Sequence, residues 1–184
     1  FQSAVEIPKV CAWLETQALE FPVAVLSAFR IMATEQPQKT ALTAAMIAHL
    51  VLKPGAHSTE SGKASLGMRV MEHLIHMFGQ DVDAHYWRNA RLVLHVFVAL
   101  APLGVVSSAS LRRTIKAFVD VLSSDGVSRD VADPAADCVI EAMCRGGTDL
   151  IQPEPGALEA LPSAREEMDA IVDGITLYLS LIHI

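Results

Sequence analysis

Apolar residues recur at helical spacing along almost the whole chain, in units of about 14 to 20 residues that short polar breaks separate. In one unit, Leu66, Val70, Leu74, Met77 and Phe78 follow one another at helical steps and share one stripe of a helix. Such a helix is stable only when another element covers its stripe. The repeated spacing therefore predicts an all-α protein built from helices that pack on one another.

The spacing predicts eight helices, and turn residues indicate several of their ends. The helices cover about residues 3–18, 22–32, 37–53, 66–78, 83–101, 107–122, 134–145 and 163–179. We expect Asp133 to cap the seventh helix, Pro134 to occupy its first turn and Gly146 to end it. Ser163, with Glu166 three residues later, is expected to form a capping box at the start of the eighth.

Eight helices with short turns make about four antiparallel pairs of about 40 residues each. This period is typical of a HEAT/ARM-like α-solenoid, in which each helix pair buries its faces by stacking on its neighbours. A length of 184 residues is compatible with one domain. We therefore expect a single helical-repeat scaffold domain over residues 1–179. The ending "LSLIHI" resembles translated sequencing adaptor, so residues 180–184 are treated as a candidate non-native tail.

The most apolar segment of the chain runs from Leu92 to Val106. As a helix it would reach roughly 22 Å at about 1.5 Å per residue, which is shorter than the bilayer's hydrocarbon layer of about 30 Å. It also contains His95, Pro102 and Gly104. Because two faces of this segment are apolar, we expect the central helix of the stack rather than a membrane span. We expect no membrane partner.

The chain is acidic, with a formal net charge of −7 at pH 7. This charge disfavours a surface whose main task is binding a phosphate backbone, although a local basic face is compatible with it. The three cysteines, Cys11, Cys138 and Cys144, match no disulfide framework or zinc knuckle, which favours a reducing compartment. The chain begins without an initiator Met or a secretory leader, so we expect a fragment of a longer protein.

Two groups of residues resemble metal-binding or phosphate-binding motifs but lack essential members. His73 and His76, with His85 further on, lie in "EHLIH" and not in the H-E-x-x-H pattern of zinc enzymes, and we expect them on a solvated face. Gly62 and Lys63 lack the earlier glycine and the following hydroxyl of a phosphate-binding loop. We therefore predict no metal and no cofactor.

The cysteines offer the remaining candidates for covalent chemistry. Cys138 and Cys144 fall in one predicted helix, and we expect them to share its buried side as inert thiols. No serine lies in a G-x-S-x-G turn. We therefore predict no catalytic residues and no enzymatic activity.

Basic residues supply a candidate surface for a partner. Arg88 follows the segment "HYW", and Arg112, Arg113 and Lys116 follow one another in "LRRTIK". Basic side chains beside aromatic rings can bind single-stranded RNA. The simpler interpretation is that Trp87 belongs to the core and that the cations form a solvated face, with the last three facing outward. These four basic residues are retained as the candidate partner or RNA surface.

Three stretches, taken in order, resemble a known family. They are "VLSAFRIMATEQPQKTALTAAMIAHLV", "YWRNARLVLHVFVALAPLGVVSSASLRRTIKAFVDVL" and "DCVIEAMCRGGTDL". Together they are similar to the first helical domain of the large subunit of the nuclear cap-binding complex, in the class named after the middle domain of translation initiation factor four-gamma. The resemblance runs from about Val23 to Tyr178. The family tends to carry aromatic residues and a Leu-Pro-Trp-like step where this chain has "EAMCRGG".

The resemblance implies a non-catalytic nuclear scaffold that grips a small RNA-recognition-motif subunit, which itself binds the capped 5′ end of messenger RNA. In the family that subunit docks mainly on later helical domains, so this domain is expected to serve mRNA processing, export and decay factors and to contact capped RNA indirectly. The implied location is nuclear, with shuttling to the cytoplasm left open. The alternative is a translation or mRNA-decay scaffold of the same domain class that binds an RNA helicase.

Overall fold

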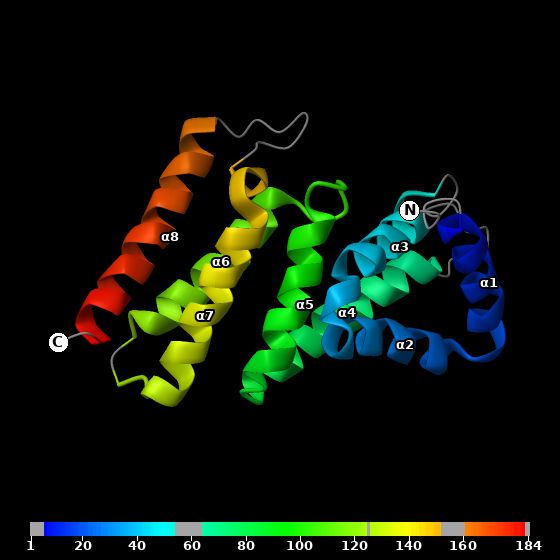
Figure 1. The fold of residues 1–184 in the computed structure, drawn as a ribbon, viewed down its shortest axis with the longest axis horizontal. Helices are drawn as coiled ribbons and strands as arrows, with labels where there is room; N and C mark the ends of the chain where they lie inside the picture. The colour runs from blue at the N-terminus through cyan, green and yellow to red at the C-terminus, as the bar shows by residue number, and fades with distance from the viewer. Residues whose placement is uncertain (1–5, 54–63, 125, 152–160, 183–184) are drawn as a thin grey trace.

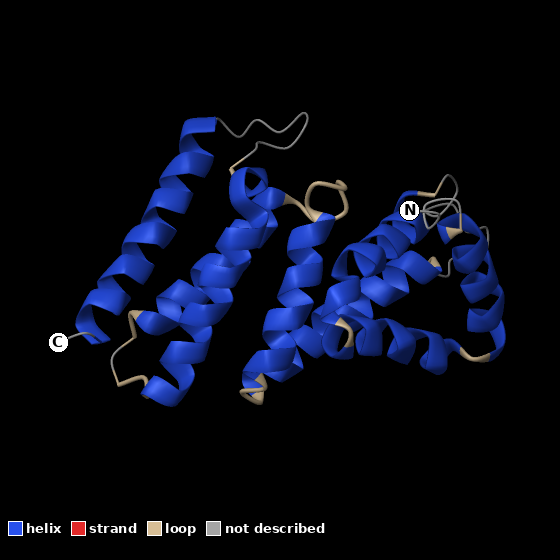
Figure 2. Cartoon of the chain, viewed as in Figure 1, coloured by secondary structure: helices blue, strands red, loops and turns tan. Residues whose placement is uncertain are grey.

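The computed structural model describes residues 6–53, 64–124, 126–151 and 161–182. Within these ranges the chain forms helices, turns and loops, without a strand (Figure 2). The α-helices are α1 (Ile7–Glu20), α2 (Pro22–Glu35), α3 (Thr40–Leu52), α4 (Leu66–Asp83), α5 (Trp87–Leu100), α6 (Ser108–Leu122), α7 (Arg129–Gly146) and α8 (Leu161–Ile182), and the short 3-10 helices are η2 (Pro37–Lys39) and η3 (Gly147–Leu150). The prediction of an all-α fold is confirmed.

The helices stack along the long axis of the molecule, with α1 and α8 at opposite ends (Figure 1). The odd-numbered helices form a continuous series, because α1 packs on α3, α3 on α5 and α5 on α7. In the even-numbered series, α2 packs on α4 and α6 packs on α8. Helices that follow one another in the chain also pair, among them α3 with α4 and α6 with α7. Helices paired and stacked in this way form a solenoid-like fold.

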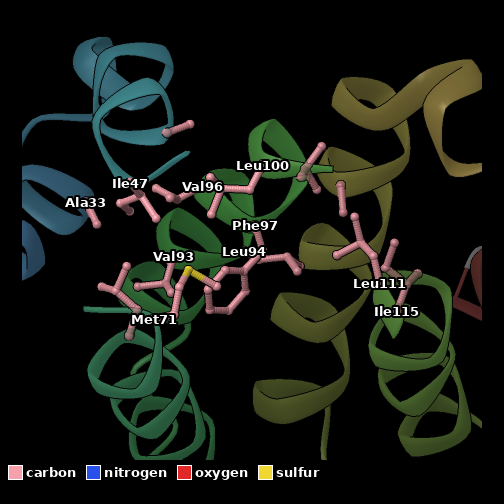
Figure 3. Close-up of a cluster of buried hydrophobic side chains, with 14 of the residues drawn as sticks. Ala33, Ile47, Met71, Val93, Leu94, Val96, Phe97, Leu100, Leu111 and Ile115 are labelled. Carbon is pink, nitrogen blue, oxygen red and sulfur yellow. The ribbon is translucent and has the colours of Figure 1, made fainter. Parts of the chain in front are cut away.

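α5 is the central helix of the stack, as its two apolar faces predict. It packs against α2, α3 and α4 toward the N-terminal end and against α7 toward the C-terminal end (Figure 1). Val93, Leu94 and Leu100 are 0% exposed. Figure 3 shows side chains of α5 between Ile47 of α3 and Leu111 of α6. None of the described helices has both the length and the apolar character that crossing a membrane requires.

The start of α7 differs from the prediction. The helix begins at Arg129, so Pro134 lies inside it rather than in its first turn. The backbone N–H of Ala132 donates to the carbonyl of Ser128 at 3.0 Å, and Ala132 is 4% exposed. The stabilisation from packing of this first turn therefore exceeds the cost of the one backbone hydrogen bond that Pro134 cannot donate. Asp133, the predicted cap, instead accepts a hydrogen bond from the hydroxyl of Tyr178 on α8.

The start of α8 also differs from the prediction. The helix begins at Leu161, so Ser163 lies within its first turn and is not its N-cap. Pro162 falls in that same turn. Backbone N–H groups there have no acceptor within the helix, so a proline costs no hydrogen bond. At its other end α8 continues through Ser180 to Ile182, so the candidate tail is helical as far as Ile182, and residues 183–184 lie outside the described residues.

The junction between α4 and α5 forms an exposed corner. α4 extends to Asp83, and α5 begins at Trp87 instead of at about residue 83. Between them His85 has a φ of 59°, and the backbone N–H of Tyr86 donates to the carbonyl of Asp81 at 2.7 Å. Few residues other than glycine adopt this left-handed conformation. The turn reverses the direction of the chain between α4 and α5, and the side chains of His85 and Tyr86 are exposed there.

Candidate functional site

The predicted outward orientation of Arg112 is wrong. The residue is 1% exposed. Its Nε donates to Oε2 of Glu167 on α8 at 2.7 Å, and its Nη1 donates to the carbonyl oxygen of Leu150 in η3 at 2.8 Å. Charged side chains are buried almost only when they are paired in this way. Arg112 therefore joins α6 to η3 and α8, and it is not part of an exposed basic surface.

The sequence contained one signal for the burial of Arg112. Residues three and seven positions apart lie on nearly the same face of a helix, so Arg112 shares a face with Ile115 and Val119. Both of those side chains are buried, at 0% and 6% exposure. Helical periodicity carries no information about the partner carboxylate, which lies 55 residues further along the chain.

The other predicted cations are exposed but lie on two different helices. Arg113 and Lys116 are on α6, and Arg88 is on α5. The guanidinium of Arg113 has only long contacts with its own helix, with Nε 3.4 Å from the carbonyl oxygen of Ala109 and Nη2 3.4 Å from Oγ of Ser110. Hydrogen bonds this long are weak, so the guanidinium can turn toward another partner.

Arg88 lines a pocket of about 180 Å³ between α5 and α7. We call it the α5–α7 pocket, and its lining residues are Trp87, Arg88, Arg91, Pro134, Asp137 and Cys138. The ring of Trp87 is partly buried and is held from two sides. It stacks on His85 with centroids 5.6 Å apart and meets Phe118 edge-on at 6.3 Å. The pocket thus combines a fixed aromatic ring with two guanidinium groups and one carboxylate.

Two hydrogen-bond donors of this pocket lack a partner among the described residues. They are the indole Nε1 of Trp87 and the Nε of Arg91, and both atoms are shielded from solvent. Arg91 is held at its far end, where Nη1 donates to Oε1 of Glu141 at 2.9 Å. Leaving a buried donor without an acceptor costs about 1 to 3 kcal/mol. Two buried donors of the lining residues are therefore left without an acceptor in the described structure.

Glu141 extends this polar region into the centre of the α5–α7 interface. Its Oε2 lies 2.8 Å from Nε2 of His95, which is 3% exposed, although the ring N–H is not directed along a hydrogen bond. Burial lowers the pKa of His95 and the positive charge of Arg145 lowers it further, whereas the carboxylate of Glu141 raises it. Because the net effect lowers the pKa, His95 is neutral at pH 7.

The two cysteines of α7 differ in exposure, contrary to the prediction that both are buried. Cys138 is buried and Cys144 is exposed. Six residues advance a helix by about 600°, so the two side chains leave it on different sides. Burial raises the pKa of Cys138 to about 11, which keeps its thiol protonated at neutral pH.

The histidines of α4 are not equivalent either. His76 is exposed, whereas His73 is partly buried, and burial lowers the pKa of His73. In the part of the chain that the structure describes, no three histidine, cysteine or acidic side chains are placed to hold one metal ion. Gly62 and Lys63, which we compared with a phosphate-binding loop, lie outside the described residues.

A second pocket, of about 210 Å³, lies between α4 and α6 and is mostly apolar. Its lining residues are Met71, Ile75, Phe78, Phe97, Val106, Ser110, Leu111 and Thr114. The rings of Phe78 and Phe118 bridge α4 and α6 with centroids 6.0 Å apart. Ile75 is 56% exposed, so part of this apolar surface is open to solvent.

No protein-family model matches this chain, and no curated protein matches it.

Proposed function

We propose that this chain is a non-catalytic scaffold domain of the nuclear mRNA cap-binding complex and supports mRNA processing, export and decay through protein contacts. The observation that carries the proposal is the ordered resemblance from about Val23 to Tyr178. Its strongest segment forms α5, α6 and the turn between them. In this proposal a small RNA-recognition-motif subunit binds the cap, and the chain contacts capped RNA indirectly.

Two features of the fold support a scaffold role. Stacked helices present an extended surface on which several partners can bind without competing for one cleft. The exposed cations Arg88, Arg113 and Lys116 are divided between two helices. Three cations are fewer than the row of phosphate contacts that nonspecific binding of RNA uses.

The alternative is a translation or mRNA-decay scaffold of the same domain class, whose partner is an RNA helicase. The segment "EAMCRGG", at the end of α7, favours this alternative because it lacks the aromatic residues that the cap-binding family tends to carry there.

Capture on an immobilised cap analogue tests the proposal. The samples are the 184-residue chain alone, a longer protein that contains it, and that longer protein together with the small RNA-recognition-motif subunit. We expect retention of the longer protein only when the small subunit is present, and elution by free cap analogue.

Three results would contradict the proposal. Retention of the 184-residue chain alone, with competition by free analogue, would indicate a direct cap site. Absence of retention of the longer protein with the small subunit would exclude the cap-binding assembly. Stable binding to an RNA helicase in a parallel pull-down, without binding to the small subunit, would favour the alternative scaffold.

A further inference from the structure

The buried donors of the α5–α7 pocket point to a missing acceptor. The indole Nε1 of Trp87 and the Nε of Arg91 belong to residues that line one pocket, and neither has a hydrogen-bond partner in the described structure. Both atoms are also shielded from solvent. A ligand that supplies acceptor atoms here would satisfy two donors at once, which favours binding by more than its contact area suggests.

The size of the pocket suits a small group. A volume of about 180 Å³ suits the end of one side chain. The lining is amphipathic, because the ring of Trp87 and Pro134 are apolar whereas Arg88 and Arg91 are cationic. A side chain with an apolar stem and an anionic end matches this combination.

The charges around the pocket favour a single carboxylate over a polyanion. Arg88 and Arg91 face one carboxylate of the lining, Asp137, and Glu141 already pairs with Arg91. The whole chain carries a net charge of −7. A nucleic acid brings many phosphates near these acidic groups and would be repelled, whereas one carboxylate accepts from the two unpaired donors.

We infer that the α5–α7 pocket binds a single aspartate or glutamate side chain from an otherwise uncharged peptide segment of a partner protein. The carboxylate accepts from Nε1 of Trp87 and Nε of Arg91, and its stem lies against the ring of Trp87 and Pro134. The exposed Arg88 attracts it to the entrance. Since neither donor atom is exposed without ligand, the guanidinium of Arg91, whose side chain is 33% exposed, rotates as the carboxylate enters.

This inference does not depend on the proposed nuclear function. It rests on the donors, the volume and the charges of the pocket, and it would hold equally for the helicase-binding alternative. Failure of the cap-capture experiment would therefore leave it intact.

Nuclear magnetic resonance of the 184-residue chain can observe the donors directly. The two tryptophans give two indole N–H signals, and Trp13 on α1, which is 59% exposed, is an internal control. The probe is a soluble glycine-rich peptide with a single glutamate at its centre, and its matched control contains glutamine in place of that glutamate. We expect the glutamate peptide to shift the Trp87 indole signal saturably, while Trp13 stays unchanged and the glutamine peptide has no effect.

Two variants test whether the donors act as inferred. Arg91→Lys keeps the charge but removes the Nε donor, and we expect the affinity for the glutamate peptide to fall roughly tenfold, as for a lost hydrogen bond to a charged group. Arg88→Gln should weaken binding roughly threefold, since exposed charge contacts contribute less. Arg113→Gln on α6 is the control and should bind like the unaltered chain. Circular dichroism verifies that each variant is folded.

The inference is overturned by any of three results. The first is the absence of a saturable shift of the Trp87 signal with the glutamate peptide. The second is an equal response to the glutamine peptide, which would show that the anion is not recognised. The third is tighter binding of a single-stranded oligouridylate than of the glutamate peptide at the same salt concentration, which would make the site a phosphate site.

Discussion

Arg112 is the largest side chain that is fully buried in the described core. Its guanidinium contacts a carboxylate of α8 and a carbonyl of η3, so a single residue orients two segments against α6. Removal of Arg112 is costly because the carbonyl of Leu150, a residue that is 0% exposed, then loses its donor without regaining water. Glu167, whose side chain is 42% exposed, regains water instead. At the scale of single residues, the polar contacts of Arg112 hold α8 and η3 against α6 at the C-terminal end of the fold.

Arg112→Ala should lower the free energy of unfolding by about 2 to 3 kcal/mol, because it leaves the carbonyl of Leu150 without its donor and opens a cavity. Arg113→Ala, one position later and exposed, should change it by less than about 0.5 kcal/mol. Urea denaturation followed by circular dichroism measures both. Equal effects of the two substitutions would show that Arg112 is not buried as described.

His95 predicts a pH dependence of stability. Its pKa is lowered in the folded state, chiefly by burial, so the unfolded chain binds a proton more readily than the folded chain does. Stability is therefore highest above the ordinary histidine pKa of about 6.5 and falls as the pH drops from there toward the lowered folded pKa. His95→Gln removes this titration.

Urea denaturation at about pH 7.5 and about pH 5.5, on either side of that ordinary pKa, tests the prediction. The unaltered chain should lose more stability between the two pH values than the His95→Gln variant does. The comparison with the variant is needed because burial also lowers the pKa of His73. Identical losses in both proteins would exclude His95 as the source.

At the scale of elements, close packing between neighbouring helices depends on small residues. Gly67, in the first turn of α4, lies against the backbone of α3. A Cβ atom at this position would come within 2.6 Å of the backbone carbon of Leu50 and 2.7 Å of its oxygen. Backbone atoms cannot turn aside as a flexible side chain can, so any larger residue would push α3 and α4 apart.

Gly67→Ala should therefore destabilise the protein by about 2 kcal/mol or more, through overpacking at the α3–α4 contact. Gly79→Ala is the matched control in the same helix, because a Cβ there has nothing within 4 Å. It should stabilise the protein by about 0.5 to 1 kcal/mol, since alanine has the higher helix propensity. Thermal unfolding gives both values. Stabilisation by both substitutions would contradict the described approach of α3 and α4.

At the scale of the whole molecule, α5 connects the N-terminal and C-terminal groups of helices. It packs on three helices toward one end and on α7 toward the other. In stacked helical folds, cooperativity depends on such contacts between neighbouring units. The two halves of the stack are therefore expected to unfold together.

Single-tryptophan variants can test this coupling, because Trp13 lies on α1 and Trp87 on α5. Trp87→Phe leaves Trp13 as the fluorescent reporter, and Trp13→Phe leaves Trp87. In each variant the fluorescence transition in urea should coincide with that variant's own circular dichroism transition, as two-state unfolding requires. A Trp13 transition at clearly lower urea concentration would show that α1 unfolds independently.

Features that arise from local periodicity were predicted from the sequence. The two apolar faces of the segment after Arg91 predicted the central position of α5, and the spacing of apolar residues predicted a helix over about 107–122, where α6 lies. The structure adds that the hydroxyl of Ser107 caps α6 by accepting from the backbone N–H of Ser110 at 3.0 Å. Such patterns are readable because burial of a stripe and capping of a helix end depend on residues a few positions apart.

The sequence by itself determined the helical fold and its central helix, because hydrophobic spacing is a local property that repeats in every unit. Tertiary structure decided which partners the buried polar residues contact. Arg112 is inside because Glu167 and Leu150 lie opposite it, Pro134 is tolerated within α7 because packing holds the preceding turn, and Trp87 and Arg91 share one pocket because α5 lies against α7. These outcomes depend on partners far away in the chain, and no local spacing encodes the position of a distant partner.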